Sequence, residues 1–115
     1  MITVYHNPRC RKSREGLALV QESGKDFFVR EYLKTPLSHL ELTNLIDKLG
    51  IAPIEIVRVN EEIWKKEFKA KELNTEDVIA ALIKHPKLIE RPIIEDEDKA
   101  VVGRPSSNIV ELLSL

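Results

Sequence analysis

The chain has 115 residues, the size of one ordinary domain, and is long enough to bury roughly two-thirds of the surface that its unfolded state exposes. With 43% hydrophobic and 32% charged residues, its composition excludes intrinsic disorder as the main state. The 18 Lys and Arg residues and 19 Asp and Glu residues leave a formal net charge of -1. No overall positive field therefore attracts a nucleic acid or an anionic membrane.

The sequence also argues against membrane insertion, secretion and metal binding through sulfur. No apolar run approaches the length of a membrane span, and the run at residues 2–5 is too short for the core of a signal peptide. We therefore expect a cytoplasmic protein with no membrane partner. The single cysteine, Cys10, excludes an internal disulfide and a multi-thiolate metal site. No metal-ligand spacing links it to a histidine, so we expect no bound metal.

The first third of the chain predicts a strand, a helix and a second strand. A β-prone run at residues 2–5 precedes a helical pattern over about residues 10–22, for which Gly24 is a natural end. The second strand is expected to cover residues 27–32. A βαβ unit of this kind favours a parallel strand pair.

Helices dominate the middle of the chain. Ser38 has capping-box spacing with the glutamate three residues later, and apolar residues at helical spacing follow as far as Gly50. Asn60 is the expected N-cap of a second helix. A third helix is expected to begin near Asn74 and to stop before Pro86.

The last part of the chain predicts a β-hairpin and a final helix. Short β-prone runs lie at residues 88–89 and 92–94 and, after an acidic turn that we interpret as solvated, at residues 100–102. Ser106 or Ser107 is expected to cap the final helix.

This order of elements predicts an α/β fold. A βαβ half and a ββα half share one mixed sheet in a three-layer arrangement, and the helices between them form an insertion over approximately residues 38–86. The order is that of the thioredoxin/glutaredoxin-like fold. We expect a single domain of this kind over residues 1–115.

Cys10 is the candidate catalytic residue, because it falls where a strand turns into a helix. Free backbone N–H groups and the positive end of the helix dipole favour a thiolate there. Four cations surround it in the sequence: Arg9, Arg11, Lys12 and Arg14. Ser13 stands where a C-x-x-C motif has its second cysteine, and its hydroxyl can hydrogen-bond a thiolate but cannot resolve a mixed disulfide. The alternative is a small buried apolar cysteine, although burial beside these cations would be unfavourable.

Three arginines are candidate ligands of an oxyanion. Arg58, Arg91 and Arg104 each lie at the end of an apolar run or between two such runs, and strand ends are where the sites of α/β folds collect. A guanidinium has five fixed donors and keeps its charge, so three converging guanidinium groups would bind a tetrahedral oxyanion. The alternative is three solvated arginines that pair with surface carboxylates.

His6 and Pro92 are candidate supporting residues. The spacing from His6 to Cys10 permits a nearby proton acceptor, and the alternative is a surface or hydrogen-bonded histidine at a strand end. Pro92 begins a predicted strand and is a candidate for a cis peptide bond at the active site, whereas an ordinary X-Pro bond is cis only ~5% of the time.

Three segments of the chain resemble the glutaredoxin-linked arsenate reductases, an ArsC-like family of the thioredoxin-like superfamily. Residues 6–14, HNPRCRKSR, are similar to the family's active-site pattern H-N-P-x-C-x-x-S-R. Residues 90–93 and 103–106 are similar to its two R-P segments, and length and element order also agree, so the resemblance covers essentially the whole chain. The best-studied members carry Gly-Thr where this chain has Arg11-Lys12, so the reductase class is better supported than arsenate itself.

The resemblance implies a glutathione- and glutaredoxin-dependent arsenate reductase that serves arsenic detoxification. Cys10 would supply the nucleophilic thiolate, and Arg58, Arg91 and Arg104 would hold arsenate. Pro92 would be the cis proline of the fold, and His6 would help to set the ionisation of the thiol. Glutathione would be a co-substrate and glutaredoxin a partner, with no bound cofactor.

Two other functions use the same fold. A monothiol, glutathione-dependent reductase of disulfides would need Cys10 without the three arginines. A non-enzymatic regulator that binds RNA polymerase would need neither, although such regulators commonly carry a C-x-x-C switch and this chain has Ser13 at the second cysteine position.

Overall fold

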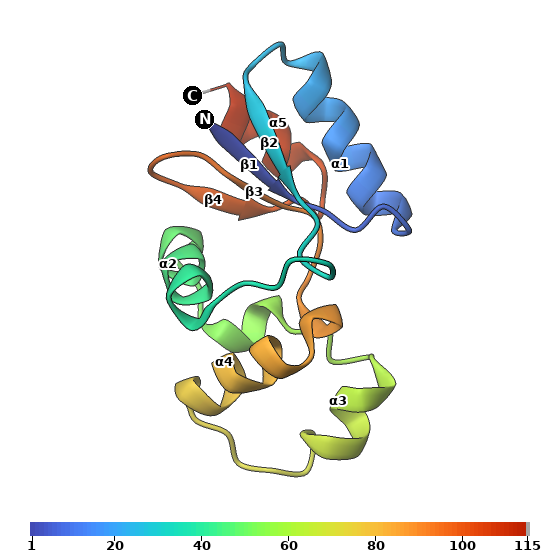
Figure 1. Ribbon diagram of the computed structural model, residues 1–115, viewed down its shortest axis with the longest axis vertical. Coiled ribbons are helices and arrows are strands. Elements are labelled where there is room, and N and C mark those ends of the chain that lie inside the picture. The colour runs from blue at the N-terminus through green and yellow to red at the C-terminus, as the bar shows by residue number, and fades with distance from the viewer. Residues whose placement is uncertain (115) are drawn as a thin grey trace. The chain divides into compact units, whose positions relative to one another are not determined.

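The computed structural model describes residues 1–114 and divides the chain into two compact units (Figure 1). The first unit consists of residues 1–35 together with the chain from residue 91 onward, and the second of residues 36–90. The prediction of a single domain with an insertion over residues 38–86 stays a prediction. Within residues 1–114, no helix combines the length and apolar character needed to cross a membrane.

The first unit contains one mixed four-stranded sheet with the strand order β2-β1-β3-β4. Its strands are β1 (Ile2–Tyr5), β2 (Phe27–Arg30), β3 (Ile93–Glu95) and β4 (Ala100–Val102). β1 pairs in parallel with β2 and antiparallel with β3, and β3 pairs antiparallel with β4. The predicted βαβ unit and the predicted hairpin are both confirmed.

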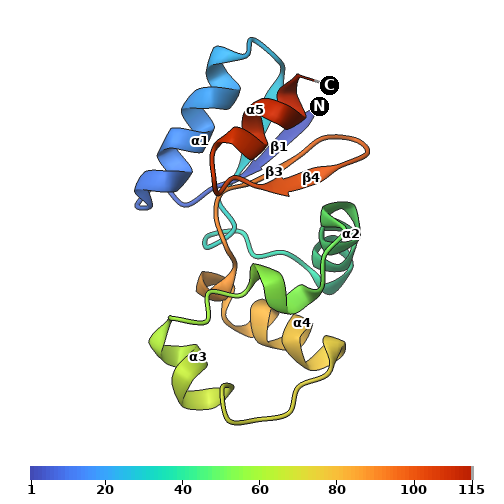
Figure 2. The ribbon, with the colours of Figure 1, turned by 180° about the vertical axis from the view of Figure 1, so that it is seen from behind.

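Two helices, α1 (Arg11–Glu22) and α5 (Ser107–Leu113), cover the same face of this sheet (Figures 1 and 2). Apolar side chains from sheet and helices form one buried core: Ile2, Val4, Val20, Ile94, Ile109 and Leu112. Burial of these side chains stabilises the packing of helices on sheet. The unit alone therefore has two layers, where the element order predicts three.

Two glycines bring the backbone close to Pro92. A Cβ atom on Gly16, in the middle of α1, would lie 2.6 Å from Cγ of Pro92 and 3.0 Å from Cδ1 of Ile109. A Cβ atom on Gly103, just after β4, would lie 2.7 Å from Cδ1 of Ile109 and 2.8 Å from Cγ of Pro92. Because larger residues do not fit, these glycines allow α1 and the end of the hairpin to enclose the proline.

The second unit is built from helices. They are α2 (His39–Leu49), the 3-10 helix η1 (Pro53–Ile56), α3 (Glu62–Glu67), α4 (Thr75–Lys84) and the 3-10 helix η2 (Pro86–Leu88). α4 packs against α2 and against both 3-10 helices. The predicted capping box at Ser38 is present, and Gly50 ends α2 in the left-handed conformation with φ 67°. Asn74 caps α4 in the same way as Ser38 caps α2.

Some predicted boundaries are wrong. β2 ends at Arg30 and not at Tyr32, because the chain turns at Glu31, whose carbonyl accepts from the N–H groups of Lys34 and Thr35. Tyr32 is fully buried in this turn. Its apolar ring explains why the pattern resembles a continuing strand.

Two of three further terminal positions differ from the prediction, and the third, the N-cap of α5, agrees with it in position. The N-cap of α3 is Glu61 and not Asn60, and it makes no side-chain capping bond. The predicted strand at residues 88–89 is absent, because Leu88 ends η2 and Ile89 makes only an isolated antiparallel bridge with Val57. Ser106 occupies the N-cap position of α5, but its side chain makes no capping bond.

Candidate active site

Cys10 lies at the N-cap position of α1 with an extended backbone, at φ -93° and ψ 122°. A tight loop leads into it: the Cys10 N–H donates to the Asn7 carbonyl at 3.0 Å, and Asn7 Oδ1 accepts from the Arg9 N–H at 3.0 Å. The Arg14 guanidinium donates to the Pro8 carbonyl at 3.0 Å. The half-buried sulfur therefore sits at the positive end of a helix, as the sequence predicts.

Arg91 and Arg104 both reach this sulfur. Arg104 donates from Nη2 to Cys10 Sγ at 3.3 Å and from Nε to the Arg91 carbonyl at 2.7 Å. The Arg91 side chain also hydrogen-bonds the sulfur. Although Cys10 and Arg104 are 94 positions apart in the chain, the pairing of β3 with β1 returns the hairpin to the active-site loop.

The environment of Cys10 favours the thiolate. Burial alone would raise the pKa of this thiol, but the backbone N–H of Ser13, the guanidinium of Arg91 and the backbone N–H of Lys12 outweigh it. The pKa of Cys10 is therefore below its ordinary value, and the fraction of nucleophilic thiolate at neutral pH is correspondingly larger.

Ser13 supports the site differently from the sequence-based expectation. Its hydroxyl does not bond the sulfur, because the oxygen is fully buried and engaged elsewhere: it accepts from the Asn7 N–H at 2.9 Å and lies 2.7 Å from His6 Nδ1. The bond to Cys10 comes from the Ser13 backbone N–H. Ser13 thus links the loop, the histidine and the helix start.

His6 is buried and neutral near pH 7. Burial lowers its pKa, the charge of Glu31 opposes that effect, and the charge of Arg14 adds to it. The buried Ser13 hydroxyl proton needs an acceptor, and the Asn7 N–H cannot be one, so we assign His6 Nδ1 as the acceptor. His6 therefore contacts Cys10 through Ser13, and its expected effect on the thiol stays a prediction.

The other predicted site residues lie as follows. The Arg91–Pro92 peptide bond is cis, and the Arg104–Pro105 bond, which the sequence did not single out, is cis as well. Arg58 belongs to the second unit, where its Nε lies 3.3 Å from Glu61 and its Nη1 lies 4.0 Å from Glu90. Its predicted part in binding an oxyanion stays a prediction.

Sequence reasoning missed two residues of this site. Asn7 organises the loop through both its backbone and its side chain, and the sequence assigned it no role beyond its position before Pro8 and its place in the pattern of residues 6–14. Tyr32 hydrogen-bonds the Arg91 side chain, but the sequence placed it in a strand. Neither contact is visible in residue spacing.

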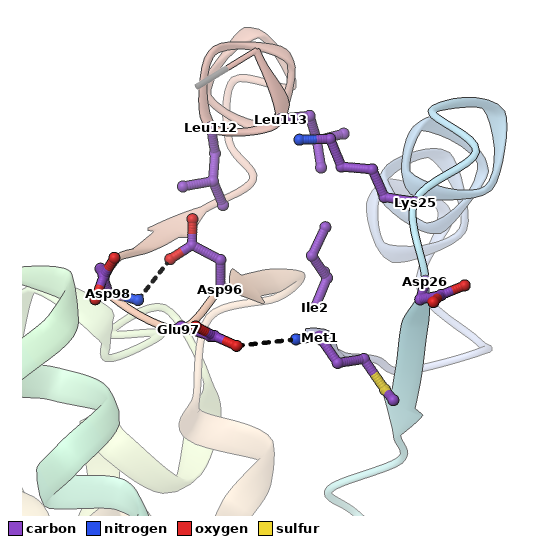
Figure 3. Close-up of a pocket in the computed structure, with 9 residues that line it drawn as sticks. All are labelled: Met1, Ile2, Lys25, Asp26, Asp96, Glu97, Asp98, Leu112 and Leu113. Carbon is purple, nitrogen blue, oxygen red and sulfur yellow. Dashed lines mark hydrogen bonds and ion pairs between the residues drawn. The ribbon is translucent and has the colours of Figure 1, made fainter.

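A second feature of the first unit is an open pocket of about 460 Å³ (Figure 3). It lies at the end of the sheet where β1 and β2 begin, opposite to the end at which Cys10 lies. Its lining residues are Met1, Ile2, Lys25, Asp26, Asp96, Glu97, Asp98, Leu112 and Leu113. The Met1 ammonium group lies 3.8 Å from Glu97, and the Asp96 carboxylate accepts from the N–H groups of Asp98 and Lys99, which shapes the acidic turn. Because carboxylates outnumber cations there, this pocket disfavours an oxyanion.

Within residues 1–114, no cluster of three or more His, Cys, Asp or Glu side chains could hold a metal ion.

Fold and site together define a thioredoxin-like protein with one activated cysteine beside two arginines. A model of the ArsC family matches residues 5–112. The chain belongs to the ArsC family.

Several relatives are similar over nearly their whole length. A protein named arsenate reductase from Neisseria meningitidis serogroup A is 40% identical over 114 residues, which cover 97% of this chain and 97% of its own. The uncharacterized protein YfgD of Escherichia coli K12 is 39% identical over 114 residues, covering 97% of this chain and 96% of its own. The solved structure of arsenate reductase from Vibrio cholerae has a TM-score of 0.90 at 39% identity, covering 96% of this chain and 95% of its own.

Proposed function

We propose that this protein is an arsenate reductase, an oxidoreductase that uses the Cys10 thiolate as its nucleophile and glutathione with glutaredoxin as its source of electrons. The observation that carries the proposal is the 3.3 Å hydrogen bond from Arg104 to the Cys10 sulfur, with Arg91 donating to the same atom. The nucleophilic sulfur of Cys10 thus lies beside two guanidinium groups that can bind an anion. The names of the relatives support arsenate as the anion.

In the first step, the Cys10 sulfur attacks arsenic. An As–S bond forms and an As–O bond breaks, and the departing hydroxide takes up a proton to leave as water. Arg91 and Arg104 donate to the arsenate oxygens, which carry the negative charge that the attack must overcome. No oxidation state changes in this step.

In the second step, the glutathione thiolate attacks the Cys10 sulfur of the adduct. A disulfide forms between Cys10 and glutathione, the S–As bond breaks, and its electron pair remains on arsenic, which is reduced from As(V) to As(III) and leaves as arsenite. A glutaredoxin thiolate then attacks the glutathione sulfur and releases Cys10. Glutaredoxin is needed because the chain has one cysteine and so no resolving thiol.

This cycle uses no metal and no bound organic cofactor. It requires a compartment that keeps glutathione reduced, which accords with the cytoplasmic location expected from the sequence. Arg58 would be a third arsenate ligand by the resemblance, and Arg58→Ala would then raise the KM for arsenate, the same effect that we expect of Arg91→Ala and Arg104→Ala.

The test is arsenite formation by the purified protein with arsenate, glutathione and glutaredoxin. We expect turnover by the wild type and none by Cys10→Ser, which removes the nucleophile and keeps the size of the side chain. Lys25→Ala, which removes a cation at the opposite end of the sheet, is the matched control and should retain wild-type turnover. Absence of arsenite with the wild-type protein would refute arsenate as the substrate.

A monothiol disulfide reductase is the second candidate, because the same lowered pKa of Cys10 would serve attack on a glutathione mixed disulfide. The two functions differ in their need for the arginines. If Arg91→Ala and Arg104→Ala lose arsenate reduction and keep disulfide turnover, arsenate is the substrate for which the site is built. If both variants keep both activities, the disulfide reductase is favoured.

A further inference from the structure

Tyr32 is a fully buried polar residue that the mechanism above does not use. It lies in the turn after β2, which two backbone hydrogen bonds to the Glu31 carbonyl hold in place, from Lys34 and from Thr35, each at 3.0 Å. A buried phenol hydroxyl needs a polar partner, since leaving it without one is unfavourable. In this turn the phenol oxygen has such a partner.

That partner is the guanidinium of Arg91. The Arg91 side chain hydrogen-bonds Tyr32 and also hydrogen-bonds the Cys10 sulfur. Burial lowers the pKa of Arg91, but the hydrogen bond to Cys10, the charges of Tyr32 and Cys10 and the hydrogen bond to Tyr32 together outweigh it and raise that pKa. The guanidinium of Arg91 thus contacts both Tyr32 and Cys10.

The arrangement limits the freedom of Arg91 from two directions. Its backbone carbonyl accepts from Arg104 Nε at 2.7 Å, and its side chain is held by a phenol that is itself buried in a hydrogen-bonded turn. An arginine side chain has many rotamers, so a buried acceptor that hydrogen-bonds its guanidinium reduces the number it can adopt. The same guanidinium hydrogen-bonds the sulfur of Cys10.

We propose that Tyr32 is a positioning residue of the active site: its buried phenol holds the Arg91 guanidinium against the Cys10 sulfur. Tyr32 thereby increases the thiolate fraction of Cys10 and the affinity of the site for a tetrahedral oxyanion. The second effect rests on the proposed function, whereas the first concerns the thiol alone.

The test compares two variants that each remove one phenol hydroxyl and keep the ring. Tyr32→Phe removes the acceptor for Arg91. Tyr5→Phe is the matched control, because Tyr5 is also buried but donates its hydroxyl to Glu95 at 2.7 Å on the sheet. The rate of Cys10 alkylation by iodoacetamide is measured against pH, and circular dichroism checks that both variants are folded.

We expect Tyr32→Phe to lower the alkylation rate about three- to tenfold at a pH below the thiol's midpoint, the effect of loosening one hydrogen bond to a charged group. The arsenate concentration that protects Cys10 by half should rise about three- to tenfold as well. Tyr5→Phe should change neither. Equal behaviour of the two variants would overturn the proposal.

A double-mutant cycle tests whether Tyr32 acts through Arg91. In an Arg91→Ala background, Tyr32→Phe should have no further effect on the alkylation profile, because the group it positions is gone. An effect of the same size in both backgrounds would show that Tyr32 acts by another route and would refute its positioning role.

A spectroscopic measurement keeps the proposal testable if Tyr32→Phe does not fold. The chain has two tyrosines, so 3-fluorotyrosine incorporated into Tyr5→Phe labels Tyr32 alone. Its ¹⁹F signal should titrate together with Cys10 alkylation and lose that titration in Arg91→Ala. A signal that does not follow the ionisation of Cys10 contradicts the proposal. None of these readouts requires arsenate turnover, so an inactive protein with the expected Tyr32 effects would refute the proposed function and not this inference.

Discussion

Gly103→Ala is expected to disturb both the core of the first unit and the site beside it. The new methyl group would lie 2.7 Å from Cδ1 of Ile109, 3.1 Å from its Cγ1 and 2.8 Å from Cγ of Pro92. All three distances are shorter than ordinary carbon contacts of about 3.5–4.0 Å. Ile109 and Pro92 are both fully buried, so neither side chain has open space into which it can move.

The size of the effect follows from these contacts. Adding one carbon to a well-packed core costs about 1–3 kcal/mol of unfolding free energy, and two rigid neighbours place Gly103→Ala in the upper half of that range. For a domain of this size the corresponding loss in Tm is roughly 8–12 °C. Ile109→Val removes the nearest atom, Cδ1, and costs about 0.5–1.5 kcal/mol by itself. In the double variant it should recover part of the loss, because that contact is relieved.

Urea unfolding of the wild type, both single variants and the double variant gives the coupling directly. Gly50→Ala is the control: no atom lies within 4 Å of its Cβ position, and its φ of 67° makes its cost one of backbone strain that Ile109→Val should not reduce. A loss below about 0.5 kcal/mol for Gly103→Ala, or strict additivity with Ile109→Val, would refute the packing argument.

Two further predictions concern the charged groups of the site. Arg104→Ala removes a guanidinium 3.3 Å from the Cys10 sulfur. The arsenate concentration that halves the rate of Cys10 alkylation should therefore rise about three- to tenfold. Lys25→Ala should leave that concentration unchanged, and equal values for the two variants would contradict the prediction. Burial lowers the pKa of His6 in the folded protein. As the pH falls, the histidine of the unfolded chain is therefore protonated before the histidine of the folded protein. The stability that neutral His6 contributes is present above the ordinary histidine pKa and is lost below it. His6→Asn should therefore lose less of its urea midpoint than the wild type between about pH 7.5 and 5.5, and identical losses would contradict the assignment.

Local signals explain what the sequence predicts well. The capping box at Ser38 and the left-handed glycine at Gly50 depend only on neighbouring residues, and both are present as expected. The position of Cys10 at a helix start is local in the same sense, since a strand, a short loop and a helical pattern follow one another directly. The prediction that the second strand extends to Tyr32 is wrong, because this residue is buried although it lies in a turn. The sequence pattern shows only that the residue favours burial, and a buried position in a turn gives the same pattern as one in a strand.

The site itself depends on contacts between distant parts of the chain. Spacing alone left Arg91 and Arg104 as either ligands or solvated side chains, and only the pairing of β3 with β1 brings them to Cys10. The role of Ser13 depended on a rotamer: its hydroxyl faces His6, and its backbone N–H faces the sulfur. Residue identity gives no information on that choice.

The acidic pocket of Figure 3 and the cysteine lie at opposite ends of the same short sheet. Although the whole chain carries a net charge of -1, the first unit is therefore electrically polar, with arginines at one pole and carboxylates at the other. For the proposed oxyanion substrate, this polarity would disfavour approach to the carboxylate pole and favour approach to the arginine pole, so the rate of its capture at Cys10 should fall as ionic strength rises.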